Sequence, residues 1–200
     1  MNEALRIILP VYLLAFFLVA FLWRSYLVWK RTGVNPYAVG RGNKPVDFIE
    51  HIYPFPMILI LLTTLAYCVS PLAYEYAVPI TWLDHVSIQI AGLILMGFAL
   101  VWTTMAQMQM GNAWRIGIDA ENRTELVEKG LFGVSRNPIF LGMRVALFGF
   151  FLALPNAMTL VSAALADVLM QIQVRIEEEF LTGQHGDKYA EFCGQVRRWI

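Results

Sequence analysis

The chain has 200 residues, of which 58% are hydrophobic and only 15% are charged. A soluble domain carries about 25% charged residues, so most of this chain is expected to face lipid or to be buried in protein within lipid. Its 15 basic and 15 acidic residues cancel, which excludes the strongly basic surface that a nucleic-acid-binding protein needs. The two cysteines, Cys68 and Cys193, are too few for a disulfide framework.

Long hydrophobic runs predict membrane-spanning helices. A helix needs roughly 17–25 mainly apolar residues to cross the hydrocarbon core of a bilayer. Five segments fit this length, at about residues 5–28, 55–74, 86–109, 138–154 and 157–176. Little more than Pro155 and Asn156 separates the last two, which predicts a tight helical hairpin. The expected fold is therefore all-α, a polytopic integral membrane protein with five transmembrane helices.

The positive residues between these spans predict the orientation of the chain. Lys and Arg occur after the first, third and fifth spans, but not between the second and third or between the fourth and fifth. The side of the membrane that carries more Lys and Arg is normally the cytoplasm. We therefore expect the N-terminus outside and the C-terminus in the cytoplasm; in a prokaryote the membrane would be the cell inner membrane.

A polar stretch before the fourth span contains the first candidate site. Gly130 and Gly133 flank a short turn on which a ligand can lie close to the backbone. Asn137 and Pro138 then begin the span: Pro suits the first turn of a helix, and Asn can cap a free amide. Taken alone, the pattern is also typical of an ordinary capped helix beside an interfacial arginine, Arg136.

An acidic run after the fifth span forms the second candidate site. Glu177, Glu178 and Glu179 cannot all lie on one face of a helix. Such runs are usually solvated, and we expect this of Glu179. Histidines occur only at positions 51, 85 and 185 and lack the spacing of zinc ligands, so no metal site is expected.

Together the two stretches resemble the Arg-His-Pro-x-Tyr and Glu-Glu signatures of integral-membrane methyltransferases that use S-adenosylmethionine. The resemblance is to the isoprenylcysteine carboxyl methyltransferase group and the related phospholipid methyltransferases. The matching residues are Leu126–Gly142, Arg175–Leu181, Gly186, Tyr189 and Arg197–Ile200. Gly111–Ile118 looks like a stretch of prokaryotic members. We therefore expect a single domain, 1–200, with N-terminal helices and a loop in 1–89 and a catalytic core in 90–200.

The resemblance implies roles for individual residues. Those implied to hold S-adenosylmethionine are Thr124, Glu125, Leu126, Val127, Phe132, Asn137, Pro138, Ile139, Phe140 and Glu177. Those implied to take part in catalysis are Arg136, Asn137, Glu177 and Glu178. Those implied to contact the acceptor are Arg144, Gln173 and Arg175. An arginine inside a span is costly and usually functional, but Arg144 can equally be a structural partner of Asp167.

The chain departs from the family pattern at three positions. Asn137 stands where a familiar member has His, and Phe140 stands where it has Tyr. Asn cannot carry charge or shuttle a proton, which argues against a histidine base at this position. Gln173 stands where the eukaryotic form has an Arg that meets the substrate carboxylate.

The expected function is methyl transfer from S-adenosylmethionine to a hydrophobic or lipid-like acceptor, such as the carboxylate of a prenylated cysteine. The water-soluble cosubstrate would enter from the cytoplasm, and the acceptor would approach from the membrane lipids. Two alternatives remain open. A sterol-type membrane reductase with a nicotinamide cofactor predicts more spans and a larger loop, whereas a non-enzymatic scaffold or carrier predicts no cosubstrate binding. The sequence leaves the oligomeric state open.

Overall fold

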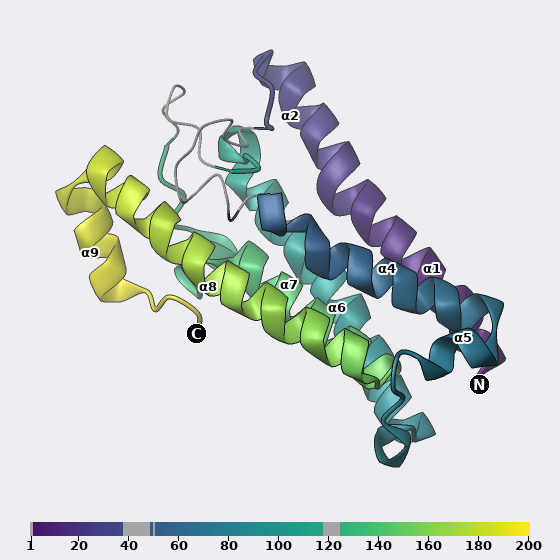
Figure 1. Ribbon diagram of the computed structural model, residues 1–200. Coiled ribbons are helices and arrows are strands. Elements are labelled where there is room, and N and C mark those ends of the chain that lie inside the picture. The colour runs from purple at the N-terminus through teal and green to yellow at the C-terminus, as the bar shows by residue number, and fades with distance from the viewer. Residues whose placement is uncertain (1, 38–48, 50, 118–124) are drawn as a thin grey trace.

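A computed structural model describes residues 2–37, 49, 51–117 and 125–200, and the regular elements in these ranges are all helices (Figure 1). The longer ones are α1 (Glu3–Phe16), α2 (Arg24–Thr32), α4 (Pro54–Val69), α6 (Val86–Met110), α7 (Pro138–Ala153), α8 (Ala157–His185) and α9 (Asp187–Gln195). The shorter ones are α5 (Pro71–Glu75), a π-helical stretch η1 (Phe17–Trp23) and the 3-10 turns η2 (Thr81–Leu83), η3 (Gly111–Ala113) and η4 (Gly130–Gly133). The all-α prediction is confirmed for this part of the chain.

Three helical stretches are long and apolar enough to cross a membrane: Glu3–Thr32, Val86–Ala113 and Ala157–His185. The first of these joins α1, η1 and α2 into one continuous helix. The helices α4 and α7 are also apolar, but each has only 16 residues. By length and composition the protein is therefore an integral membrane protein.

Close contact between α6 and α7 forms the centre of the fold, and glycines make it possible. A Cβ atom at Gly92 of α6 would lie 2.5 Å from the carbonyl oxygen of Gly149 and 2.5 Å from the amide nitrogen of Ala153, both on α7. Helices in a membrane are not driven together by the hydrophobic effect, because lipid is as apolar as their side chains. Small residues stabilise their association by letting the backbones approach closely. Larger apolar residues, among them Met96 and Phe150, fill the adjoining core.

The connection between α7 and α8 is the tight hairpin that the sequence predicts. Asn156 caps α8, because its side-chain oxygen accepts a hydrogen bond from the Thr159 amide at 3.0 Å. Its side-chain nitrogen donates to the Leu154 carbonyl at 2.8 Å. One buried asparagine therefore satisfies backbone groups on both sides of the turn.

One predicted span is interrupted. The segment 55–74 is not one helix: α4 ends at Val69, and Ser70 caps the separate helix α5, which begins at Pro71. Proline has no amide hydrogen and is best suited to the first turn of a helix, so Pro71 favours a new helix start. The helix α8 extends beyond the predicted span to His185, because Glu, Gln and Leu are good helix formers and a stop comes only at Gly186, which has a positive φ of 56°.

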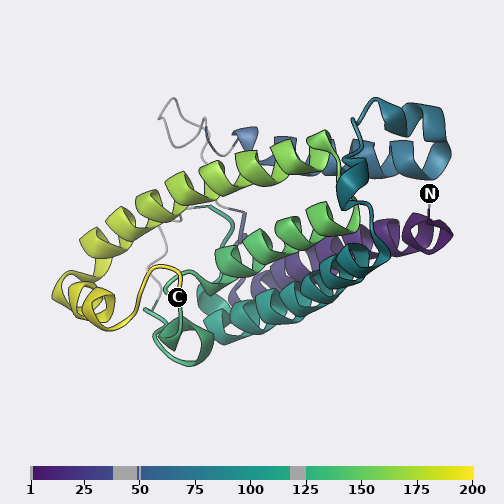
Figure 2. The same ribbon diagram turned by 90° about the horizontal axis from the view of Figure 1, so that it is seen from below.

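The two ends of the helical bundle differ in what they carry. In both views the N-terminus and α5 lie at one end, and α9 and the C-terminus lie at the other (Figures 1 and 2). The helix α7 begins, and α8 ends, on the side of α9 (Figure 1). Both candidate stretches of the sequence therefore lie at this end, which we call the site end.

Candidate active site at the start of helix α7

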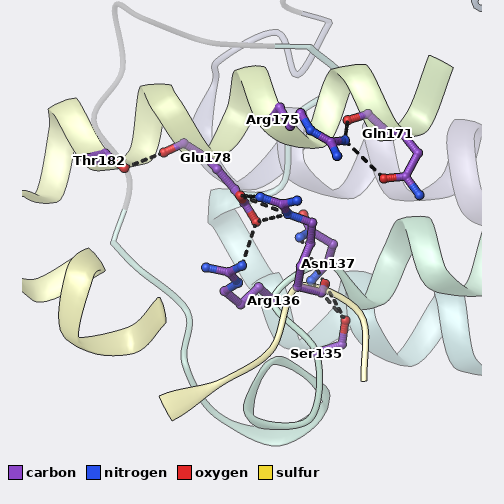
Figure 3. Close-up of polar contacts among 8 residues, drawn as sticks. Ser135, Arg136, Asn137, Gln171, Arg175, Glu178 and Thr182 are labelled. Atoms are coloured by element: carbon purple, nitrogen blue, oxygen red, sulfur yellow. Dashed lines mark hydrogen bonds and ion pairs between the residues drawn. The ribbon is translucent and has the colours of Figure 1, made fainter. Parts of the chain in front are cut away.

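The carboxylate of Glu178 lies at the centre of an ion cluster at the site end (Figure 3). Arg198, in the C-terminal segment 196–200, donates from Nε to both carboxylate oxygens at 3.1 Å and from Nη2 to Oε2 at 2.7 Å. Arg136, in the turn before α7, lies 3.3 Å from Oε1. The side chains of Glu178 and Arg136 are each only 13% exposed, so water screens this pair weakly.

The C-terminal segment lies across the start of α7. The Arg136 amide donates to the carbonyl of Arg197 at 3.0 Å. Ser135 Oγ and Asn137 Nδ2 both donate to the carbonyl of Arg198 at 3.3 Å. Asn137 therefore does not cap α7 with its side chain, and that prediction is wrong: its polar atoms instead fasten the C-terminal segment to the helix start.

The start of α7 is held from the other side by α6. Pro138 occupies the first turn as predicted, and its carbonyl accepts a hydrogen bond from Trp102 Nε1 at 2.8 Å. The preceding turn η4 begins at Gly130, which has a positive φ of 68°. Gln109 Oε1 accepts from the amide of Leu131 in this turn at 2.7 Å. The path from η4 into α7 is thus fixed by side chains of α6.

Glu177 faces a different set of residues. Its Oε1 accepts a hydrogen bond from Gln173 Nε2, one turn earlier on α8, at 3.0 Å. Burial raises the pKa of Tyr53, which directly precedes α4, and the negative charge of Glu177 raises it further. The carboxylates of the two adjacent glutamates therefore interact with groups on different sides of α8.

The three residues implied to contact the acceptor lie in different surroundings. Gln173 is buried against Glu177. Arg144 forms an ion pair with Asp167, with 2.5 Å between Nε and Oδ1, and its guanidinium lies 4.4 Å from the ring centre of Trp199. Arg175 is exposed and donates to Gln171 of its own helix (Figure 3). The structural partner considered for Arg144 in the sequence is thus present.

The other residues implied to hold the cosubstrate lie just before η4, in η4 and in the first turn of α7. They are Glu125, Leu126, Val127, Phe132, Pro138, Ile139 and Phe140. Glu125 is exposed, whereas Phe132 is buried. Thr124 lies outside the described residues.

Within the ion cluster, two positive groups share one negative group. Two guanidinium groups, from Arg136 and Arg198, share the single carboxylate of Glu178. Hydrogen bonds to Glu178 raise the pKa of Arg198, so Arg198 stays positively charged. The N-terminus of a helix adds a partial positive charge of about half an elementary charge. Free amides at the start of a helix suit an anionic group.

Four residues at the site end were given no role from the sequence. Arg198 and Trp199 stood in the matched motif at the end of the chain, so that motif could have drawn attention to them. Ser135 precedes the arginine of the first motif. No sequence pattern indicated a role for Tyr53, because its position depends on how α4 packs against α8.

Comparison with known proteins identifies the family to which the chain belongs. A family model described as phospholipid methyltransferase matches residues 88–188, half of the chain. The chain belongs to the phospholipid methyltransferase family, whose integral-membrane methyltransferases include the isoprenylcysteine carboxyl methyltransferases. It is thus a membrane methyltransferase for lipid-like substrates. No curated protein matches the chain.

Proposed function

We propose that the protein transfers a methyl group from S-adenosylmethionine to a lipid-like acceptor, with the cosubstrate bound at the start of α7. The single observation that carries the proposal is the ion cluster itself. It joins the first motif, through Arg136, to the second motif, through Glu178. These two stretches are far apart in the sequence, and they meet at one end of the helical bundle (Figure 3).

The residues present fit such a cosubstrate. Arg136 Nε is buried and has no hydrogen-bond partner among the described residues. Together with the amides of the first turn of α7, it is suited to the carboxylate of the cosubstrate. Glu177 offers a carboxylate for the α-amino group or for the sulfonium end. Phe140, in the first turn of α7 and only partly buried, supplies apolar surface at the helix start.

S-adenosylmethionine supplies a methyl group on a positively charged sulfur. The acceptor atom forms a bond to the methyl carbon while the carbon–sulfur bond breaks, and the electron pair of that bond stays on sulfur. A carboxylate acceptor needs no base, because the reaction neutralises one negative and one positive charge. The protein then contributes mainly by holding the two reactants in line and by excluding water.

The finer points of the proposal follow from the sequence. The five apolar helices cross the membrane, with the N-terminus outside and the site end in the cytoplasm. Residues 90–200 form the catalytic core of a single domain. The carboxylate of a prenylated cysteine is the acceptor that the sequence resemblance implies. A nicotinamide-dependent reductase and a non-enzymatic carrier lack the support of the family match.

The test is whether the product S-adenosylhomocysteine binds. Purified protein in detergent should unfold at a higher temperature with this ligand, since saturation at 100 times Kd adds about 2.7 kcal/mol of stability. Arg136→Gln should weaken the effect. Arg175→Gln is the matched control, because Arg175 is an exposed arginine bonded within α8. An unchanged unfolding temperature at millimolar ligand would contradict the proposal.

A further inference from the structure

The end of the first long helix gathers basic residues without acidic ones. The helix Glu3–Thr32 has 30 residues, whereas roughly 20 are enough to cross the hydrocarbon of a bilayer. Its last part, α2, therefore lies at the level of the lipid headgroups. Residues 17–37 and 86–117 contain four basic residues and no Asp or Glu. The four are Arg24, Lys30, Arg31 and Arg115, and we call them the α2 patch.

Contacts hold these two stretches of the chain together. Arg24 Nη2 donates to the carbonyl of Gly111 at the end of α6. The amide of Ile116, next to Arg115, donates to the carbonyl of Pro36 at 2.8 Å. The α2 patch is separate from the ion cluster, because α2 lies well apart from α9 and from the end of α8 (Figure 1).

One member of the α2 patch, Arg24, is buried without a counter-charge. The residue is only 6% exposed. Among the residues that the structure describes, its Nε has no hydrogen-bond partner and its guanidinium has no carboxylate partner. The carbonyl of Gly111 compensates only part of the charge, since the C-terminus of a helix carries about half a negative charge. A buried charge that lacks a partner is costly, so an anion close to Arg24 would stabilise the protein.

An open pocket lies between α2 and the segment that follows it. It has a volume of about 370 Å³ and is lined by Ser25, Tyr26, Trp29, Asn35, Pro36 and Tyr37. The Nζ atom of Lys30 lies 5.9 Å from the ring centre of Tyr26, which places a positive charge at this pocket. Trp29 and Tyr37 are more than half exposed. Exposed Trp and Tyr are typical of the headgroup level of a membrane protein.

The charges and the hydrogen-bonding groups select the occupant. A phospholipid with a net negative charge is attracted to basic residues at the headgroup level, and each Lys or Arg adds to the attraction. A zwitterionic headgroup brings its own cation, which the α2 patch repels. Asn35 Oδ1 accepts from the Tyr37 amide at 3.0 Å, so the side-chain nitrogen of Asn35 is left to donate to a phosphate, as is the hydroxyl of Ser25.

We propose that this pocket binds the headgroup of a phospholipid with a net negative charge. The phosphate accepts hydrogen bonds from Ser25 and Asn35, while Lys30 and the buried Arg24 attract it. Trp29 packs against the glycerol and the upper part of the acyl chains. This lipid is a bound partner of the protein and not the methyl acceptor, so the site is independent of the proposed methyl transfer.

The test compares three probes: dioctanoyl phosphatidylglycerol, dioctanoyl phosphatidylcholine and glycerol phosphate. Each is added to the purified protein in an uncharged maltoside detergent, and the unfolding temperature is followed against probe concentration. Phosphatidylglycerol should raise the unfolding temperature saturably, and less so at higher salt concentration. An equal shift with phosphatidylcholine would overturn the selection by charge. An equal shift with glycerol phosphate would overturn the lipid as the occupant.

Variants locate the binding. Lys30→Gln should weaken phosphatidylglycerol binding about fivefold, the effect of one basic residue near an anionic headgroup. Lys129→Gln is the matched control, because Lys129 is exposed and lies before η4. Trp29→Leu should weaken binding as well, and its control is Trp82→Leu in η2, where Trp82 is 74% exposed.

Arg24→Gln should also weaken binding, because it removes the buried charge. If that variant fails to fold, Lys30→Gln and Trp29→Leu decide the question, since both residues lie at the surface. Unchanged affinity for phosphatidylglycerol in both of these variants would place the lipid elsewhere and overturn the assignment.

Discussion

Glu177 and Glu178 are consecutive residues of α8, yet their carboxylates bind different partners. Glu178 holds Arg136 and Arg198, whereas Glu177 accepts from Gln173. Successive residues of a helix are rotated by about 100°, so neighbours point to different sides. The acidic run therefore connects α8 to the start of α7 through Glu178, whereas the hydrogen bond of Glu177 to Gln173 lies within α8.

Replacement of Glu178 by Gln should destabilise the site end. The variant keeps the shape of the side chain but removes the charge that holds Arg136 and Arg198. We expect the free energy of unfolding to fall by about 1–3 kcal/mol, in the lower part of this range because Arg198 is 34% exposed. Thermal unfolding in detergent measures it. Glu179→Gln, at an exposed position, is the control, and equal unfolding temperatures for the two variants would refute the expectation.

Replacement of Glu177 by Gln should reduce methyl transfer far more than replacement of Glu179. The family resemblance gives Glu177 the cosubstrate contact, and a carboxylate shielded from water stabilises a cation only while it is charged. The rate of methyl transfer to lipid extract and the affinity for S-adenosylhomocysteine are the measurements. If both variants keep the activity of the unaltered protein, the acidic run has no role in the site.

Replacement of Gly92 by Ala should disrupt the contact between α6 and α7. The added Cβ would lie 2.5 Å from backbone atoms of Gly149 and Ala153, and backbone cannot move aside cheaply. We expect a loss of about 1–3 kcal/mol in unfolding free energy. Gly97→Ala on the same helix is the matched control, because nothing lies within 4 Å of its added Cβ. That variant should be as stable as the original protein or slightly more stable.

Stability should fall in alkaline solution through two buried tyrosines. Burial is the main cause that raises the pKa of Tyr53 and of Tyr189, and nearby glutamates add to it. Below the ordinary tyrosine pKa of about 10, the phenol is protonated in both the folded and the unfolded chain, and the folded state has its full stability. Above it the unfolded chain releases the proton first, so stability declines with rising pH. Tyr53→Phe and Tyr189→Phe should each flatten the decline in unfolding temperature above about pH 10, and an unchanged slope would contradict the assignment.

Reporter tags should reveal the orientation. Tags placed after Ile200 or within 111–136 should report the cytoplasm, and tags before Met1 or within 75–84 should report the outer side. This follows from the distribution of Lys and Arg. An external tag after Ile200 would put the site end on the side without S-adenosylmethionine.

The hydropathy pattern, together with Pro and Gly residues at helix ends, predicted much of the fold. The bounds of α6 and α7 agree with the predicted spans to within a residue, since turns and a proline mark their ends. The helix α8 runs past its predicted span, because hydropathy falls at Arg175 while helix propensity does not. The pairing of Glu178 with Arg198 depends on the turn between α8 and α9, and the position of Tyr53 depends on packing. Neither leaves a periodic signal in the sequence.

The length of α8 has a consequence for where the lipid must be when it reacts. The helix has 29 residues, which at about 1.5 Å per residue is longer than the roughly 30 Å of hydrocarbon in a bilayer. Glu178 lies near the point where such a helix leaves the hydrocarbon. In the proposed reaction, a lipid anchored by its tail then presents its headgroup at the depth of the ion cluster. Such a lipid would react without being extracted from the membrane, and diffusion in the plane of the bilayer would be sufficient for it to arrive and leave.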